Sequence, residues 1–109
     1  MSGRTTIEAG ADVTTLINVF VVAPADQQRL VDLLVAATEE VMRHQPGFVS
    51  ANIHASLDGS RVVNYAQWRS VEDFQAMLAN PEAGHHMAAA VALATAEPHL
   101  FTVASVHHA

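Results

Sequence analysis

The chain has 109 residues, half of them hydrophobic and 15% charged, which suits one domain with its own core and leaves no room for a second. Eleven acidic residues against five arginines and no lysine give a formal net charge of -6, which argues against a nucleic-acid-binding protein. Cysteine is absent, so disulfides and thiol nucleophiles are excluded. No apolar run reaches the ~18 residues of a membrane helix, so we expect a soluble cytoplasmic domain without membrane contact.

The first half of the chain is predicted to form a tail, a strand and a helix. Residues 1–12 are small and polar, and we expect a mobile tail. β-branched and apolar residues predict a strand over Val13–Val22, which Pro24 ends. From Asp26 to about His44, apolar residues recur every three or four positions, which predicts an amphipathic helix that stops at Gln45-Pro46-Gly47.

A hairpin is predicted next. Phe48 to about Leu57 and Arg61–Trp68 both alternate as strands do. Asp58-Gly59 lies between them, and this dipeptide is typical of a tight turn between antiparallel strands.

The last third is predicted to contain two helical segments and a strand. Ser70 can cap a short helix, which Asn80-Pro81 interrupts. The Ala-rich segment from Glu82 to about Thr95 is expected to be helical. Pro98 is expected to end that segment, and Leu100–Val106 to form a fourth strand.

The predicted order, β-α-β-β-α-β, indicates an α+β fold of the ferredoxin-like kind, with an antiparallel sheet and helices on one face. We expect a single domain over residues 13–109. A chain this short has nothing left to cover the second sheet face, so we expect two sheets to pack face to face as a homodimer.

Two asparagines stand in strands that are otherwise apolar. Strand alternation places Asn18 on one face with Phe20, and Asn64 on one face with Trp68. A buried carboxamide costs a few kcal/mol unless it finds partners. Either Asn alone is explained more readily by a backbone partner in a bulge or loop. The pair, together with the single Trp, predicts a lined cavity in which the indole could stack on a flat aromatic substrate.

The histidines fall into groups. His54 lies mid-strand on the face of Asn52 and Ser56, so it would serve as an acid or base only if that face borders the cavity, and otherwise belongs to an interface. His85 and His86 stand early in the Ala-rich helix and could reach the mouth of a pocket. No metal-ligand spacing and no Gly-rich phosphate loop is present, so we expect no metal, flavin or nucleotide.

The segment HASLDGSRVVNYAQW (His54 to Trp68) resembles the antibiotic biosynthesis monooxygenase family, as do the shorter QPGFVSANI and HLFTVASV. It is most similar to the cofactor-independent anthrone oxygenases of actinomycete aromatic polyketide pathways. This resemblance implies a dimeric α+β barrel of two ferredoxin-like chains. It also implies oxidation of an anthrone-type polycyclic phenol to a quinone, with O₂ as co-substrate and no cofactor.

The resemblance also implies site residues. It places Asn64 and Trp68 in the active site, matches Asn18 to a first-strand Asn of related members, and matches His54 to a pocket His. Phe74 stands where some members carry a Tyr, and Gly84-His85-His86-Met87 where they carry a pocket Arg. The expected substrate-binding or acid/base residues are therefore His54, His86, Phe74 and Phe20.

Three other functions suit the same fold, because fold does not fix function. The first is a haem-binding or haem-degrading protein with His85 or His86 as the iron ligand. The second is a ligand-binding dimer without catalytic activity, and the third is a cyclase or isomerase.

Overall fold

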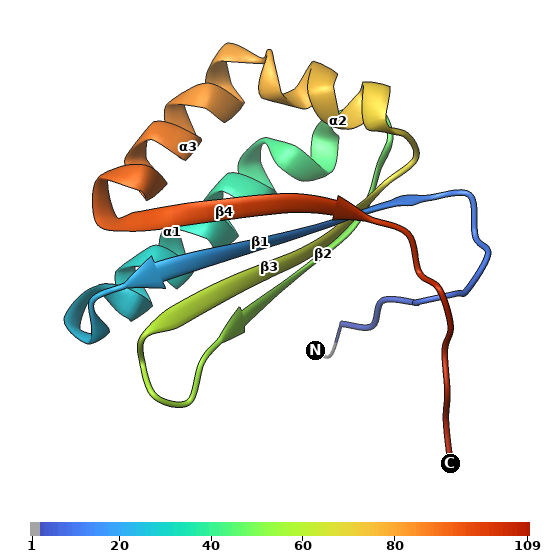
Figure 1. Ribbon diagram of the computed structural model, residues 1–109. Coiled ribbons are helices and arrows are strands. Elements are labelled where there is room, and N and C mark those ends of the chain that lie inside the picture. The colour runs from blue at the N-terminus through green and yellow to red at the C-terminus, as the bar shows by residue number, and fades with distance from the viewer. Residues whose placement is uncertain (1–2) are drawn as a thin grey trace.

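A computed structural model describes residues 3–109, so Met1 and Ser2 of the expected tail lie outside the described part. Four antiparallel strands form one sheet in the order β2-β3-β1-β4, and the helices lie together on one of its faces (Figure 1). This arrangement confirms the predicted ferredoxin-like α+β class. The described residues include no helix long and apolar enough to cross a membrane.

The elements follow the predicted order, with two short 3-10 helices (η) flanking the first long helix. In chain order they are β1 Thr14–Val22, η1 Pro24–Asp26, α1 Gln27–Glu40, η2 Met42–His44, β2 Phe48–Ala55, β3 Arg61–Trp68, α2 Val71–Leu78, α3 Pro81–Leu93 and β4 Ala94–Phe101.

The predicted position of the last strand was wrong. We expected Leu100–Val106, but β4 begins at Ala94, directly after α3. Pro98 lies inside this strand, opposite Asn18 of β1. β4 is an edge strand bonded only to β1, so the missing N–H of proline can face the unpaired side at no cost to the ladder.

The long helix α1 packs as its periodicity predicted. Leu30, Leu34 and Ala37 are its buried residues, all 5% exposed or less. The helix is shorter than expected, because residues at both ends of the predicted span form η1 and η2 instead. The predicted apolar stripe is therefore correct, and only the helix limits differ.

Gly47 fixes the path of the chain from η2 into β2. Its φ is +83°, and a Cβ at this position would collide with the side chain of Asp73 in α2. Its carbonyl accepts a hydrogen bond from the amide of Arg69 at 2.8 Å. The close approach brings the start of β2 against the loop after β3, beneath α2.

The core is divided into two clusters. One contains Phe20, Leu30 and Ala90 among its members, and the other consists of Val41, Trp68, Met77 and Ala83. They occupy different parts of the space between the sheet and the helices. A molecule of this size would ordinarily have one continuous core, so the division points to a space between the clusters.

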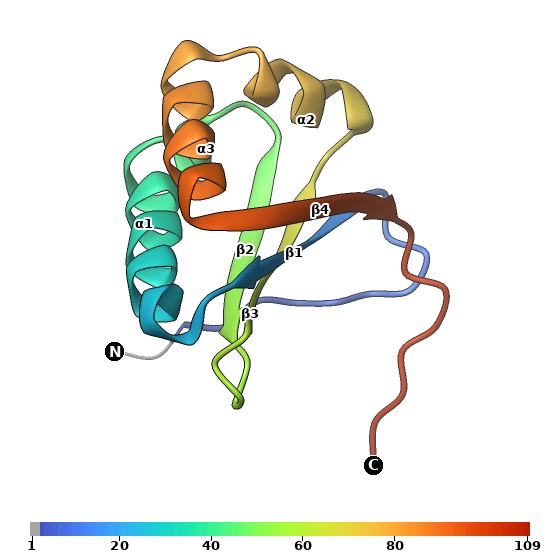
Figure 2. The ribbon, with the colours of Figure 1, turned by 60° about the vertical axis from the view of Figure 1, so that its left-hand side comes forward.

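The N-terminal segment crosses the sheet on the side away from the helices (Figure 2). The Thr5 hydroxyl donates to Asn52 Oδ1 at 2.7 Å, on the outer face of β2. Residues 3–13 contain no helix or strand. The expected tail therefore has a contact with the domain, and its mobility stays a prediction.

Candidate active site

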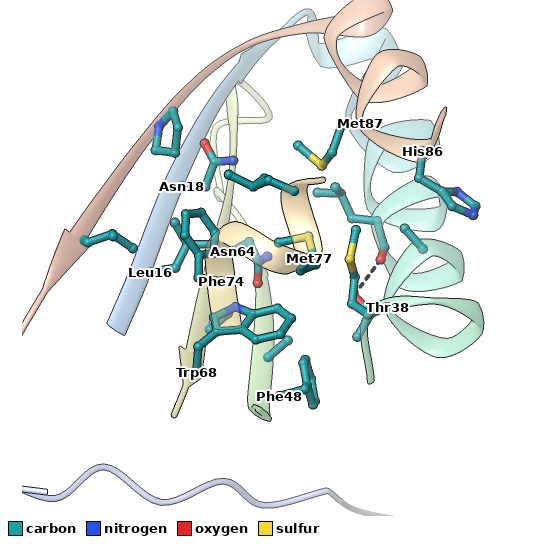
Figure 3. Close-up of a pocket in the computed structure, with 18 of the residues that line it drawn as sticks. Leu16, Asn18, Thr38, Phe48, Asn64, Trp68, Phe74, Met77, His86 and Met87 are labelled. Carbon is teal, nitrogen blue, oxygen red and sulfur yellow. Dashed lines mark hydrogen bonds between the residues drawn. The ribbon is translucent and has the colours of Figure 1, made fainter. Parts of the chain in front are cut away.

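A cavity of about 450 Å³ lies between the sheet and the helices (Figure 3). We call it the sheet–helix cavity. Its volume is within the range of small-molecule sites, and most of its lining is apolar. It reaches all four strands, all three α-helices and η2, and its lining residues are Leu16, Asn18, Phe20, Leu34, Ala37, Thr38, Met42, Phe48, Ala51, Asn64, Ala66, Trp68, Phe74, Met77, Leu78, His86, Met87, Pro98, His99 and Leu100.

The two asparagines are direct neighbours across the centre of the sheet. Asn18 of β1 and Asn64 of β3 are partners in the antiparallel register, and both side chains face the helices. Trp68 lies further along β3 on the same face, with only Ala66 between it and Asn64 on that face. The three side chains therefore share one floor, and the small Ala66 leaves open space above it.

Three buried polar atoms of this floor have no hydrogen-bond partner. Asn18 Oδ1, Asn64 Oδ1 and Trp68 Nε1 are buried and make no hydrogen bond. Asn18 is 4% exposed and Trp68 is 2% exposed. An unsatisfied buried polar group costs about 1–3 kcal/mol, so three in one cavity call for an explanation. All three belong to side chains that line the sheet–helix cavity.

Two phenyl rings hold the Trp68 indole in position. The ring of Phe48 is 5.5 Å from it at an interplanar angle of 89°, and that of Phe74 is 6.3 Å away at 63°. Both are edge-to-face arrangements, which favour a fixed ring orientation. Phe20, another predicted substrate contact, is 1% exposed and lines the cavity from β1.

Phe48 reaches the cavity because of a β-bulge. The register of β2 against β3 shifts between Phe48 and Ser50, so Phe48 stands opposite Trp68 and Ser50 opposite Gln67. Without the extra residue, simple alternation would put Phe48 and Ser50 on the same face. The sequence analysis missed Phe48 as a site residue, and nothing in the sequence marks the bulge.

His54 lies on the other side of the sheet. It stands opposite Val63, on the face of Asn52 and Tyr65, and it is exposed. Asn64 and Trp68 face the helices, so β2 carries His54 away from them. From the sequence, His54 could act as an acid or base only if its face of the strand bordered the cavity. In the single chain that face does not border the cavity.

His86 lies at the margin of the cavity, on α3. Its ring is directed towards α1, away from the floor (Figure 3), and Nε2 is 3.9 Å from Glu40 Oε2. The His86 side chain is 22% exposed. His85 is exposed and does not line the cavity. His99 also lines it, although its side chain is 63% exposed, 3.4 Å from Glu97.

The mouth of the cavity lies between α2 and β4. Leu78 of α2 and Leu100 of β4 line the cavity but are 49% and 40% exposed. Phe20 and Trp68, which line the cavity from β1 and β3, are almost fully buried. A flat ligand entering here would pass between apolar side chains before its oxygens reach the floor.

The helices contribute residues that the sequence analysis missed as site residues. Met42, Met77 and Met87 line the cavity from η2, α2 and α3. Thr38 also lines it, but its hydroxyl already donates to the Leu34 carbonyl at 2.8 Å. Apolar residues at helical spacing read as core from the sequence alone, so only their position beside an open space identifies them.

No three His, Asp or Glu side chains within residues 3–109 are close enough together to hold a metal ion. The sheet–helix cavity itself carries no carboxylate, and its polar lining comes from carboxamides, one indole, one hydroxyl and two imidazoles.

Comparison with known proteins agrees with this architecture. The family described as "Antibiotic biosynthesis monooxygenase" matches residues 14–93. The chain is 57% identical over 81 residues to tetracenomycin-F1 monooxygenase of Streptomyces glaucescens, a match covering 74% of this chain and 72% of that protein.

Two solved structures of oxygenases resemble the fold. SnoaB of Streptomyces nogalater, a cofactor-independent oxygenase, has a TM-score of 0.73 at 33% identity, covering 88% of this chain and 97% of that one. The ActVA-Orf6 monooxygenase of Streptomyces coelicolor, solved with nanaomycin D, has a TM-score of 0.79 at 32% identity, covering 88% and 91%. The oxygenase class expected from the sequence is confirmed, and the chain is a member of the antibiotic biosynthesis monooxygenase family.

Proposed function

We propose that the sheet–helix cavity binds an anthrone-type polycyclic phenol and oxidises it to a quinone with O₂, without a cofactor. The observation that carries this proposal is the row of three unpartnered polar atoms, on Asn18, Asn64 and Trp68, in a cavity whose other walls are mainly apolar. Such a site suits a flat aromatic molecule with oxygens along one edge. One relative described as a monooxygenase and another described as a cofactor-independent oxygenase support the same chemistry.

The substrate itself supplies the reducing power. The methylene of an anthrone is acidic, because its carbanion is delocalised into the neighbouring rings and the keto group. This anion can transfer one electron to O₂, and recombination of the two radicals forms a carbon–oxygen bond to a peroxide. Loss of water then gives the second carbonyl. One O₂ is consumed, one oxygen atom enters the product and the other leaves as water, so the overall reaction balances.

The protein contributes binding and electrostatics. The amide groups of Asn18 and Asn64 would donate to the oxygen that gains negative charge in the anion, and their Oδ1 atoms would accept from a phenol hydroxyl. The Trp68 indole N–H would donate to the peroxide or to a ring oxygen. Donors fixed in a dry cavity stabilise developing charge more strongly than water does. The phenyl rings around Trp68 keep its N–H directed at the substrate.

We propose His86 as the group that exchanges protons with the substrate. It borders the cavity, and an imidazole can take up and release a proton near neutral pH. Because the ring is directed towards α1, transfer would pass through a water molecule. His86→Gln should lower kcat and remove an ionisation from the pH profile of kcat. An unchanged pH profile would assign the proton transfer to another group.

We also propose that the chain works as a homodimer through the outer face of the sheet. Val21 of β1 and Phe101 of β4 lie on that face and are 49% and 46% exposed. Half-exposed apolar side chains on a sheet face are typical of an interface. Light scattering should report twice the mass of the chain, and a monomer at micromolar concentration would contradict this association.

The decisive experiment is incubation with dithranol after metal chelation. The rate of quinone formation should exceed that in buffer, need O₂ and persist in EDTA. The matched anaerobic sample should form no quinone until air is admitted. A rate equal to that of buffer alone would refute the proposed substrate class, and a rate abolished by EDTA would refute cofactor independence.

A further inference from the structure

Methionine is concentrated around the cavity. The chain has four methionines, and three of them, Met42, Met77 and Met87, line the sheet–helix cavity. They come from three different helical elements, whereas the sheet contributes none. We call these three side chains the thioether roof, because they lie across the cavity from the polar floor, as Figure 3 shows for Met77 and Met87.

The floor and the roof differ in stiffness. The floor consists of short or planar side chains on paired strands, where Asn18 and Asn64 are neighbours and Trp68 is held by two phenyl rings. A methionine side chain is unbranched and has three rotatable bonds, so it fills irregular spaces at little cost. The floor therefore fixes the position of a ligand's oxygens, and the roof can adjust to the rest of the ligand.

The packing of the roof supports this difference. Met77 belongs to the second core cluster, and Met42 packs against the same cluster. Met87 packs against the first cluster, on the other side of the cavity. Met42 and Met87 are only partly buried. Each roof residue thus has a packed side and an open side, and a change of rotamer on the open side needs no movement of the helices.

We infer that the thioether roof determines which ring systems the enzyme accepts, and that it allows tetracyclic as well as tricyclic phenols to bind. The inference rests on the proposed function, because it concerns the substrate of that same cavity. With the oxygen-bearing edge held by the floor, additional rings extend under the roof. Leucine has nearly the volume of methionine but is branched and stiffer. Replacing the three roof methionines by leucine should therefore reduce the range of ring systems that bind, without enlarging the cavity.

Binding can be measured without turnover, because Trp68 is the only tryptophan and lies in the cavity. Quenching of its fluorescence gives Kd for two probes: dantron, the tricyclic quinone of dithranol, and a tetracyclic dihydroxynaphthacenequinone. The proteins compared are the wild type, Met42→Leu/Met77→Leu/Met87→Leu, and the control Ile53→Leu. Ile53 packs against the first cluster but does not line the cavity. Free N-acetyltryptophanamide corrects for absorption by the quinones.

The triple variant should bind the tetracyclic probe at least about tenfold more weakly than the wild type, and the tricyclic probe within about threefold. Ile53→Leu should change neither Kd. An unchanged ratio of the two Kd values in a folded triple variant would overturn the inference about the roof alone. Failure of the wild type to bind either probe would instead overturn the proposed substrate class.

Single replacements keep the test valid if the triple variant does not fold. Met42→Leu and Met87→Leu alter partly buried side chains and should each shift the ratio of the two Kd values by about threefold. No shift in either single variant would overturn the inference as well.

Discussion

At the scale of single residues, a comparison of two asparagines separates a structural carboxamide from a candidate ligand-binding one. Asn52 and Asn64 lie on opposite faces of the same sheet. The Asn52 side chain donates to the Tyr65 carbonyl at 3.1 Å and accepts from Thr5, so its polar atoms are satisfied within the protein. Asn64 Oδ1 is buried without a partner. The polar atoms of Asn52 are therefore satisfied by the fold, whereas Asn64 Oδ1 has no partner in the fold and is available to the proposed substrate.

This contrast gives a prediction for Asn64→Leu. Removing an unsatisfied buried oxygen should leave the free energy of unfolding unchanged or raise it by about 1 kcal/mol. The rate should fall, because the donor to the anion is lost, with kcat for dithranol reduced by about 10- to 100-fold. Urea denaturation and steady-state kinetics measure the two effects.

Asn52→Leu is the matched control, because it removes satisfied hydrogen bonds on the face of the sheet opposite the cavity. It should lower stability and leave kcat nearly unchanged. The opposite pattern, with Asn64→Leu unstable and active, would show that Asn64 serves the fold and not the reaction.

Trp68→Phe tests the indole N–H. The variant keeps an aromatic ring between Phe48 and Phe74 but removes the unpartnered donor. We expect kcat to fall about tenfold or more, as for the loss of one hydrogen bond in a transition state. Phe74→Leu is the control, because it loosens the packing of the indole without removing a donor, and its kcat should fall less. Equal losses in both variants would reduce the role of Trp68 to packing.

At the scale of elements, the hairpin between β2 and β3 is stabilised by one carboxylate. Asp58 accepts hydrogen bonds from the Ser60 amide and from the hydroxyls of Ser60 and Ser56, at 2.7–2.9 Å. These bonds, those from Ser60 first, lower the pKa of Asp58 from 3.8 to about 2. Gly59 beside it has a φ of +81°, a backbone conformation that a residue without a Cβ adopts readily.

The lowered pKa of Asp58 makes the stability of the folded state depend on pH in the acid range. Ionised Asp58 stabilises the folded state fully above its unfolded pKa of 3.8, and this contribution is lost as the pH falls towards about 2. Asp58→Asn should therefore lose less stability than the wild type between these two pH values, as measured by the midpoint of urea denaturation.

Glu8→Gln is the control for Asp58→Asn, because Glu8 lies on the N-terminal segment and its side chain forms no ion pair within residues 3–109. If the midpoint of urea denaturation falls with pH equally in Asp58→Asn and in the wild type, the stability of the hairpin does not depend on this charge.

Elements whose signals are local were predictable, and those set by tertiary contacts were not. Neighbouring residues in the sequence are enough to predict three features: the apolar stripe of α1, the Asp58-Gly59 turn, and the alternation that aligns Asn64 with Trp68. The start of β4 was not, because the Ala-rich segment before it carries no stop signal and pairing with β1 decides where the helix ends. Pro98 was expected to end the helical segment, and only the sheet order reveals that it can lie within an edge strand.

The candidate site was predictable in part for the same reason. Alternation correctly grouped Asn18 with Phe20, and Asn64 with Trp68, although it did not reveal that the two asparagines are direct cross-strand partners. The outer position of His54 depends on the register of β2 against β3. The roof methionines are indistinguishable from core residues until the two clusters are seen to be separate.

At the scale of the whole molecule, the divided core predicts that a ligand stabilises the fold. A flat quinone in the sheet–helix cavity would contact Phe20 of one cluster and Trp68 of the other. A ligand present at 100 times its Kd adds about 2.7 kcal/mol to the free energy of unfolding. Dantron should therefore raise Tm in proportion to the logarithm of its concentration.

Trp68→Phe should weaken the effect of dantron on Tm, whereas Ile53→Leu should not. A Tm independent of dantron in the wild type would show that the cavity does not hold the ligand.

The hydrogen bond from Thr5 to Asn52 has a consequence for assembly. It places the N-terminal segment on the outer face of the sheet, which is also the surface proposed to meet a second subunit. A partner subunit that packed on this face would meet the N-terminal segment before it met the strands. In the proposed dimer, the segment would either form a layer of the interface or be displaced by the partner.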